Sequence, residues 1–302
     1  MSDSRPRYVW VDGAIRPATD LHLSVFDRGF QLGDGLFETL RARGGHVTEL
    51  EEHCARLRRS ADGLGIELPS DVDARLARGI DDLLAAEGLG GPGGDASVRI
   101  TVSRGAWSSR GLLPPSTVHL EPTIVIQAWP VTPAPPDHLE RGLSLVASAI
   151  RRDPSNPILS LKTTSRADYV FARLEARRAG AEDAVFLTTS GHLSECTTAN
   201  IFLVRTAPDG VTELATPDLA CAILPGTTRS WLLHWADGVG LRGVEGWLTP
   251  DELAAAAEAF MSSSVAGVLP ITRFNGHPIG DGRPGPWTLR ARADREAFIG
   301  AG

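Results

Sequence analysis

The stretch 130-PVTPAPPDHLERG-142 divides the chain into two halves and so decides its architecture. Its four prolines restrict the backbone and favour a stiff, extended segment. The halves on either side both contain strand-like and helix-like patterns, without a strict strand–helix alternation. The pattern predicts an α+β protein of two domains. We expect residues 1–129 to form the first domain, 130–137 the linker and 138–302 the second domain.

The half before the linker has clear local signals. Asp12-Gly13 lies between two short apolar runs and predicts a hairpin turn. The spacing of apolar residues predicts helices over 50–64 and 72–88. Alternating and β-branched residues predict strands over 97–105 and 123–131.

The half after the linker begins with a predicted strand over 143–150. A helix is predicted over 165–180, with an apolar stripe formed by Ala167, Val170, Phe171 and Leu174. Two more helices are predicted, over 225–238 and over the alanine-rich segment 251–260.

Composition excludes several classes of protein. Of the 302 residues, 42% are hydrophobic and 22% are charged, which is typical of a folded globular chain. The net charge of -7 argues against a nucleic-acid-binding surface. No apolar run is long enough to cross a membrane, and the first residues contain no apolar segment like that of a secretory signal. We therefore expect a cytoplasmic protein with no nucleic-acid or membrane partner.

Lys162 is the only lysine among the 30 basic residues. A lysine amine forms a Schiff base with an aldehyde, whereas a guanidinium does not do so readily. A general bias toward arginine explains the composition equally well, so the neighbourhood of Lys162 must decide. Lys162 lies in 158-ILSLKTTSRADY-169, just before a predicted helix, and can point into a cleft from a rigid element. Pyridoxal 5'-phosphate (PLP) is the commonest aldehyde cofactor held by lysine.

PLP also needs a phosphate cradle, a partner for its pyridine nitrogen and packing against its ring. The phosphate can bind to the N–H groups and hydroxyls at a helix start, to a serine-rich turn and to an arginine on a helix. The candidates are Thr227 and Thr228 after Pro225-Gly226, Ser263 and Ser264 in the turn 262–264, and Arg56. Glu195 is the candidate for the pyridine nitrogen and Leu224 for the ring. Each of these residues alone has an ordinary structural explanation. The histidines and cysteines lack the paired spacing of a metal site, and no metal is expected.

Six motifs occur in one order along the chain. They are FDRGFQLGDGLFETLR (26–41), H-x-x-R-L (53–57), the lysine before a helix, ECTTANIF (195–202), LPGTTR (224–229) and MSSSVAGVLPI (261–271). Together they resemble the class IV (fold type IV) PLP-dependent aminotransferases, from about residue 8 to about residue 295. The resemblance implies a homodimer of two-domain subunits with PLP in the interdomain cleft.

The same resemblance implies a role for each matching residue. Lys162 is expected to form the Schiff base and to carry the proton between substrate and cofactor. Glu195 is expected to bind the pyridine nitrogen, and Leu224 to pack on the ring. The phosphate is expected to bind to Arg56, Thr227, Thr228 and Ser264.

The motifs indicate the family more directly than they indicate the particular enzyme within it. MSSSVAGVLPI and the segment 280-GDGRPGPWT-288 resemble D-amino acid transaminases. GDGLFETLR and ECTTANIF resemble aminodeoxychorismate lyases about as closely. We expect a transaminase that moves an amino group from a D-amino acid to a 2-keto acid. The alternatives are an aminodeoxychorismate lyase, which releases 4-aminobenzoate and pyruvate, a branched-chain L-amino acid transaminase, or a PLP-binding scaffold without turnover.

The substrate residues depart from the D-amino acid pattern. In that group an arginine and a histidine usually lie two residues apart in the loop that here spans 103–115, and a tyrosine completes the carboxylate site. Here Arg110 is present without the histidine, and Phe37 occupies the tyrosine position. Arg110 is expected to bind the carboxylate alone or with Arg99 or Arg41. A weaker carboxylate site would also admit (R)-amines.

Overall fold

A computed structural model describes residues 5–301. The chain forms two compact units. The first contains the residues up to Thr132, the segment Leu161–Arg166 and the residues from Ile299 onward, and the second contains Pro133–Ser160 and Ala167–Phe298. The change of unit after Thr132 lies inside the segment 130–137 expected to be the linker. The segment that carries Lys162 belongs to the first unit, although it follows the linker in the chain.

The first unit is built on a six-stranded antiparallel sheet of order β2-β1-β6-β5-β3-β4. The strands are β1 (Tyr8–Val11), β2 (Ala14–Pro17), β3 (Gly35–Arg43), β4 (His46–Val47), β5 (Asp95–Ser103) and β6 (Thr123–Pro130), and the helices are α1 (Arg28–Leu32), α2 (Leu50–Leu64) and α3 (Val72–Glu87). Asp12 and Gly13 both have positive φ, 47° and 106°, and form the predicted hairpin turn. The predicted helices over 50–64 and 72–88 are confirmed.

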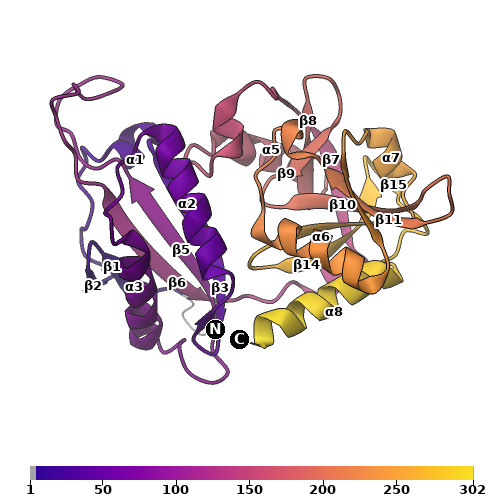
Figure 1. Cartoon of the computed structure of the whole chain (residues 1–302), viewed down its shortest axis with the longest axis horizontal. Coiled ribbons are helices and arrows are strands. Elements are labelled where there is room, and N and C mark those ends of the chain that lie inside the picture. Colours follow the sequence, from indigo (N-terminus) through magenta and orange to yellow (C-terminus); the bar gives the residue numbers. More distant parts are fainter. Residues whose placement is uncertain (1–4, 302) are drawn as a thin grey trace. The chain divides into compact units, whose positions relative to one another are not determined.

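Helices α2 and α3 cover one face of this sheet (Figure 1). Residues alternate along β5, so that Val98, Ile100 and Val102 are buried in the core with Leu57 and Leu76 of the helices. The intervening β5 residues lie on the other face. That alternation places Arg99 on the face that does not carry the helical core.

The second unit contains a nine-stranded sheet of order β12-β11-β10-β13-β14-β7-β8-β9, with β15 paired to β14. The strands are β7 (Leu143–Arg152), β8 (Asp183–Thr188), β9 (Leu193–Cys196), β10 (Asn200–Thr206), β11 (Thr212–Pro217), β12 (Arg242–Gly246), β13 (Glu258–Ser263), β14 (Gly267–Phe274) and β15 (His277–Pro278). The helices are α4 (Pro136–Glu140), α5 (Ala167–Arg178), α6 (Thr227–Val239), α7 (Pro250–Ala254) and α8 (Pro286–Gly300), with two 3-10 turns, η1 (Pro157–Ser160) and η2 (Leu219–Cys221).

Two sequence predictions for this unit are wrong. The helix predicted over 251–260 ends at Ala254, and Glu258 begins β13. The turn expected over 262–264 is also wrong in part, since Ser262 and Ser263 end strand β13 and only Ser264 lies in the turn. On α5 the predicted apolar stripe is not the buried face, since Val170 and Phe171 are 59% and 48% exposed while Ala172 and Ala176 are buried.

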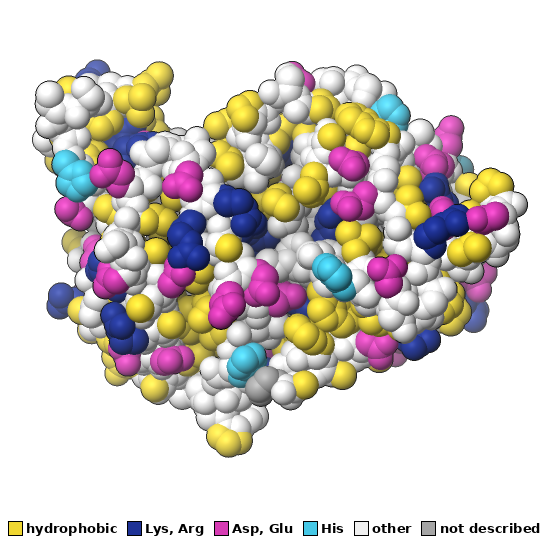
Figure 2. All heavy atoms as spheres, viewed as in Figure 1, with side chains coloured by type: hydrophobic (Ala, Val, Ile, Leu, Met, Phe, Trp, Pro, Cys, Tyr) yellow, Lys and Arg dark blue, Asp and Glu magenta, His cyan; other side chains and the backbone are white. Residues whose placement is uncertain are grey.

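Within residues 5–301, no helix is long and apolar enough to span a membrane. Acidic and basic side chains are interspersed over the face drawn in Figure 2, in keeping with the modest net charge. Cys54, Cys196 and Cys221 are buried and free, and burial raises the pKa of Cys54 and Cys221 to about 11.

Candidate active site

Lys162 is held against the start of β3 by its backbone. The Phe37 N–H donates to the Lys162 carbonyl at 3.0 Å, and the Thr164 N–H donates to the Gly35 carbonyl at 2.9 Å. The Lys162 N–H donates to Ser60 Oγ on α2 at 3.3 Å. The segment thus extends the sheet of the first unit locally and gives the lysine side chain a rigid base.

Three cationic side chains surround the Phe37 ring. The distances from the ring centroid are 4.0 Å to Arg99 Cζ, 4.7 Å to Lys162 Nζ and 5.6 Å to Arg166 Cζ. Phe37 itself is 7% exposed. The structure therefore brings together two of the predicted substrate residues and the predicted catalytic lysine, and adds an arginine that the sequence analysis did not single out.

Strand register explains why Arg99 meets Phe37. Phe37 pairs with Thr101 and Thr39 pairs with Arg99, so Phe37 and Arg99 lie on the same face of neighbouring strands. Burial lowers the pKa of Arg99, and the positive charge of Arg166 lowers it further. Two guanidinium groups that repel each other in a partly buried place favour an anion between them.

Arg41 is engaged elsewhere. Its Nε and one terminal nitrogen donate to the two carboxylate oxygens of Asp95, both at 2.8 Å. Arg43 donates to the same carboxylate at 3.0 Å. The alternative in which Arg41 assists Arg110 is not supported by this geometry.

Arg56 lies on the helical side of β3, in a buried cluster with Glu38 and His53. Arg56 Nε and Nη2 donate to the two Glu38 oxygens at 2.8 and 2.6 Å, and His53 Nδ1 lies 2.7 Å from Glu38 Oε2. Burial disfavours the charge of Glu38, but the hydrogen bonds and charge of Arg56, with help from His53, outweigh it and lower the Glu38 pKa to about 2. These contacts orient the Arg56 guanidinium.

Arg110 lies in the exposed loop between β5 and β6. Within residues 5–301 it makes no hydrogen bond or ion pair. The structure therefore does not group Arg110 with Phe37 and Arg99, and its substrate role stays a prediction.

In the second unit, the structure brings Glu195 and Leu224 together. Glu195 lies on β9 and is 5% exposed. Its Oε2 accepts the Leu224 N–H at 3.0 Å, and its Oε1 accepts the hydroxyl of Tyr169 at 3.2 Å. The carboxylate is thus held by two neutral donors, one on each oxygen.

The start of α6 gathers the predicted phosphate hydroxyls. The hydroxyl oxygens of Thr227 and Ser264 are 3.4 Å apart, and the cap residue Gly226 has no side chain to occupy the first N–H groups of the helix. The Thr228 hydroxyl accepts from Arg295 at 3.2 Å. Ser262 Oγ is buried and, among the described residues, has no hydrogen-bond partner. The start of a helix with hydroxyl groups beside it suits an anionic group.

The other predicted hydroxyl has a local use. Ser263 Oγ accepts the Ala266 N–H at 3.4 Å, which closes the turn between β13 and β14.

Two residues near the site, Arg166 and Tyr169, were not predicted from the sequence. Their only signal was proximity to Lys162 in the chain, together with the rarity of tyrosine, of which the sequence has two.

The sequence model of the family Amino-transferase class IV matches residues 35–274. The chain belongs to the class IV aminotransferases. These enzymes use PLP, so the predicted family, fold type and cofactor are confirmed. The prediction that the chain is an aminotransferase of this class is likewise confirmed.

Several class IV aminotransferases are similar over nearly the whole chain. A Methanocaldococcus jannaschii protein named "Putative branched-chain-amino-acid aminotransferase" is 32% identical over 94% of this chain and 93% of its own length. D-alanine aminotransferase of Bacillus licheniformis is 29% identical, with 93% of each chain covered. The structure of the Escherichia coli branched-chain amino acid aminotransferase superposes with a TM-score of 0.87 at 27% identity, covering 98% of this chain and 94% of that one.

Proposed function

We propose that this class IV aminotransferase takes the amino group of a D-amino acid and transfers it to a 2-keto acid. The observation that carries the substrate class is the cluster of Arg99, Arg166 and Lys162 around Phe37. A substrate with both an amine and a carboxylate suits a nucleophilic amine beside two guanidinium groups. The serine-rich segment 262–264 and the likeness to D-alanine aminotransferase support the D-amino acid as donor.

The residues of both units fit PLP. The uncapped start of α6, the Thr227 and Ser264 hydroxyls and the orphan hydroxyl of Ser262 suit its phosphate. We propose that Thr228, Ser263 and Arg56 also serve the phosphate.

Glu195, oriented by two neutral donors, is proposed to bind the pyridine nitrogen, and Leu224 is fixed beside it by its own N–H. Bound PLP supplies an aldehyde that condenses with amines and a ring that withdraws electrons from the reacting carbon.

The remaining chemistry is assigned to the protein. Lys162 is proposed to hold the cofactor through its amine and, once displaced by substrate, to move a proton from the substrate Cα to the cofactor. Arg99 and Arg110 are proposed to bind the carboxylate, and Phe37 to pack beside Arg99. Arg166 joins Arg99 in this proposal because both face the same ring.

A half-reaction tests the donor. The PLP-loaded protein is mixed with excess D-alanine, without a keto acid, and the visible absorbance of the cofactor is followed. Loss of the absorbance supports a D-amino acid donor, whereas an unchanged spectrum with D-alanine rules it out. (R)-1-Phenylethylamine in the same assay tests whether a carboxylate is needed.

A branched-chain L-amino acid transaminase is the second candidate, because the 32% identical relative carries that name. L-Leucine in the same half-reaction distinguishes it. An aminodeoxychorismate lyase remains an alternative, tested by release of 4-aminobenzoate from aminodeoxychorismate.

We also propose a homodimer located in the cytoplasm. Exposed apolar side chains in and before α1 support a second copy on this surface, since Leu21 is fully exposed and Phe30 is 76% exposed. Light scattering during size-exclusion chromatography measures the assembly: the mass of one chain, 32.1 kDa, would refute the dimer.

A further inference from the structure

The loop 104–122 joins β5 to β6 and carries Arg110 in its outer part. Residues 108–113 are exposed, and Leu112 is 81% exposed. Within residues 5–301, every hydrogen bond that reaches 108–113 comes from one side chain, that of Arg28. The position of the outer loop thus depends on a residue far away in the sequence.

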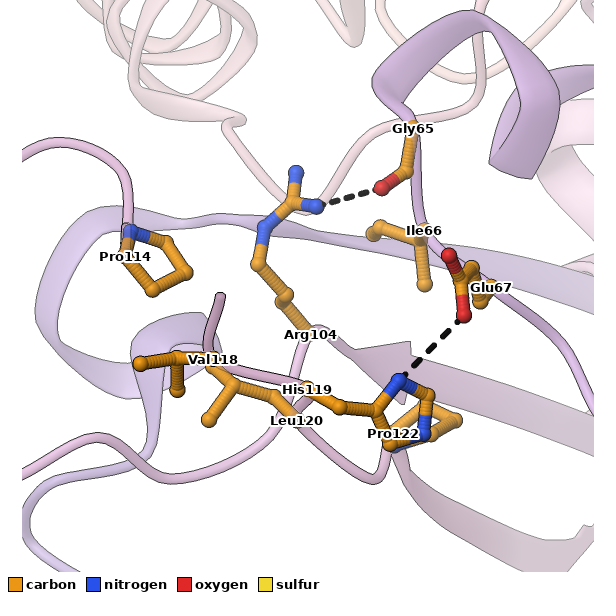
Figure 3. A pocket seen from close by; sticks show the side chains of 9 residues that line it. All are labelled: Gly65, Ile66, Glu67, Arg104, Pro114, Val118, His119, Leu120 and Pro122. Atoms are coloured by element: carbon orange, nitrogen blue, oxygen red, sulfur yellow. Dashed lines mark hydrogen bonds and ion pairs between the residues drawn. The ribbon is translucent and has the colours of Figure 1, made fainter. Parts of the chain in front are cut away.

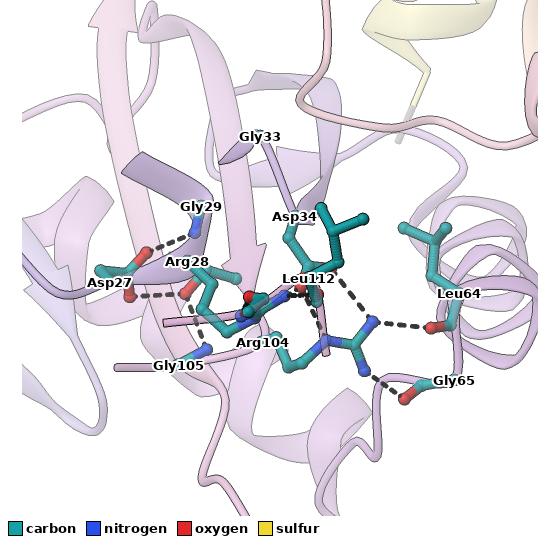
Figure 4. A network of polar contacts seen from close by, with 12 residues as sticks. Asp27, Arg28, Gly29, Gly33, Asp34, Leu64, Gly65, Arg104, Gly105 and Leu112 are labelled. Atoms are coloured by element: carbon teal, nitrogen blue, oxygen red, sulfur yellow. Dashed lines mark hydrogen bonds and ion pairs between the residues drawn. The ribbon is translucent and has the colours of Figure 1, made fainter. Parts of the chain in front are cut away.

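Arg28 is almost fully buried, at 2% exposed, and lies on the short helix α1. Its Nη1 donates to the Gly111 carbonyl at 3.2 Å, and its Nη2 donates to the Leu112 carbonyl (Figure 4). Gly111 directly follows Arg110, so the Arg28 guanidinium binds the backbone next to the proposed substrate residue. The Trp107 ring lies 5.7 Å from Arg28 Cζ and packs on the same turn.

Asp34 orients the Arg28 side chain through a hydrogen bond to its Nε. Its Oδ2 accepts from Arg28 Nε and from Arg104 Nε, both at 2.8 Å. Arg104 in turn donates to the carbonyls of Leu64 and Gly65, at 2.8 and 2.6 Å, at the end of α2 (Figure 4). Burial raises the pKa of Asp34, but hydrogen bonds from Arg104 and Arg28 outweigh it and lower the pKa. A continuous charged network therefore connects α2 to the outer loop.

The base of the loop is fixed independently, by backbone contacts. The Arg28 N–H donates to the Gly105 carbonyl, and the Trp107 N–H donates to the Phe26 carbonyl, both at 3.0 Å. Gly105 has a φ of 99°, and a Cβ there would lie 2.1 Å from the Glu121 carbonyl oxygen, which shows how closely the two ends of the loop meet. Only the outer part relies on the Arg28 side chain.

The returning part of the loop, residues 114–122, lines a hollow on the first unit. Pro114, Val118 and His119 line a hollow of about 90 Å³ with Arg104 (Figure 3). Across this hollow, His119 Nδ1 lies 3.3 Å from Glu67 Oε2. Among the described residues, no hydrogen bond or ion pair joins this returning part to residues 108–113.

We infer that Arg28 is a positioning and specificity-determining residue, which places Arg110 for the substrate carboxylate by holding the carbonyls of Gly111 and Leu112. The inference rests on the proposed role of Arg110. Arginine suits this task because its planar fork reaches two carbonyls and Asp34 together, whereas a lysine ammonium is a single point of contact. Gly111 directly follows Arg110 in the chain, so a shift of these carbonyls also moves the backbone of Arg110.

Arg28→Lys tests the inference while keeping the charge. Trypsin, with mass spectrometry of the 110–111 bond, reports the loop without any need for activity. We expect faster cleavage at this bond than in the wild type. We also expect kcat/KM for the amino acid donor to fall about 10-fold to 100-fold, mainly through KM. Arg58→Lys is the matched control, since Arg58 forms an exposed ion pair with Asp73 in the same unit.

The outcomes separate this inference from the proposed function. If Arg110→Ala leaves KM unchanged, the proposed role of Arg110 fails, and the inference with it. If Arg110→Ala raises KM but Arg28→Lys does not, only the inference fails. Unchanged cleavage in Arg28→Lys also overturns it. If both variants raise KM, the double variant should be no worse than Arg110→Ala, because both changes act on one contact. Should Arg28→Lys not fold, Asp34→Asn replaces it with the same expectations.

Discussion

Tyr169 donates its hydroxyl hydrogen to Glu195 Oε1 at 3.2 Å, and the other Glu195 oxygen accepts the Leu224 N–H. The Tyr169 ring is itself fixed, since the buried Arg152 guanidinium lies 4.2 Å from its centroid and 4.0 Å from that of Phe186. Tyr169 therefore orients the carboxylate proposed to bind the cofactor's pyridine nitrogen.

Tyr169→Phe is expected to weaken PLP binding by about 2- to 10-fold, the value of one neutral hydrogen bond. Titration of the apo-protein with PLP measures this, and the pH dependence of the cofactor's visible absorbance reports the change at Glu195. Tyr8→Phe is the matched control, because Tyr8 is the only other tyrosine and lies in the other unit. Equal PLP affinity in the wild type and Tyr169→Phe would refute the positioning role.

Lys162→Ala is expected to reduce transamination by about 100-fold to 10,000-fold, since the sequence has no second lysine to carry the proton. Borohydride treatment of the PLP-loaded wild type should leave the cofactor's mass on one peptide, the one that contains Lys162. The absence of any other lysine makes this test unambiguous. Appreciable turnover by Lys162→Ala would show that the assignment is wrong.

Glu38 should make the first unit sensitive to acid. Its pKa is lowered from the ordinary 4.5 to about 2, so its stabilising charge is present above about pH 4.5 and is lost as the pH falls toward 2. Burial also lowers the pKa of His53, whose protonation in acid acts in the same direction. The free energy of unfolding should therefore fall steeply below pH 5, as measured by urea unfolding at several pH values.

Glu38→Gln is expected to lower the free energy of unfolding at pH 7 by about 3–5 kcal/mol, because it removes the buried charge that accepts from Arg56 and contacts His53. The acid-dependent slope should also become shallower. Glu67→Gln serves as control, since Glu67 is 80% exposed and its loss should cost under about 1 kcal/mol. Similar losses for the two variants would contradict the buried pair.

Gly226→Ala tests the proposed phosphate cradle. A Cβ at Gly226 would lie 2.1 Å from Asn200 Oδ1, and Asn200 Nδ2 donates to the Leu224 carbonyl at 3.0 Å. The substitution must displace Asn200 from the turn before α6, so we expect weaker PLP binding. Gly238→Ala, in the same helix with open space around it, should instead keep PLP affinity and stabilise the fold by about 0.5–1 kcal/mol. Unchanged PLP affinity in Gly226→Ala would count against the cradle.

Sequence patterns failed where tertiary contacts override local preference. The alanine-rich segment 251–260 favours a helix by propensity, yet Glu258 to Ser263 pair with β10 and β14 as strand β13. On α5 the apolar stripe pointed to the wrong face, because Ala172 and Ala176 are the residues that pack with Ala184 and Phe186 of the sheet. Neither outcome is visible in a single segment.

The sequence by itself determined the family, the cofactor and most of the residues proposed to serve it, because the single lysine and the ordered motifs are local features that need no coordinates. Tertiary structure decided how these residues are used. Pairing of β3 with β5 places Arg99 on the Phe37 ring, and the segment after the linker returns Lys162 to the first unit. The Arg28 network and the Tyr169–Glu195 contact join residues far apart in the chain, and only folding brings such partners within hydrogen-bond distance.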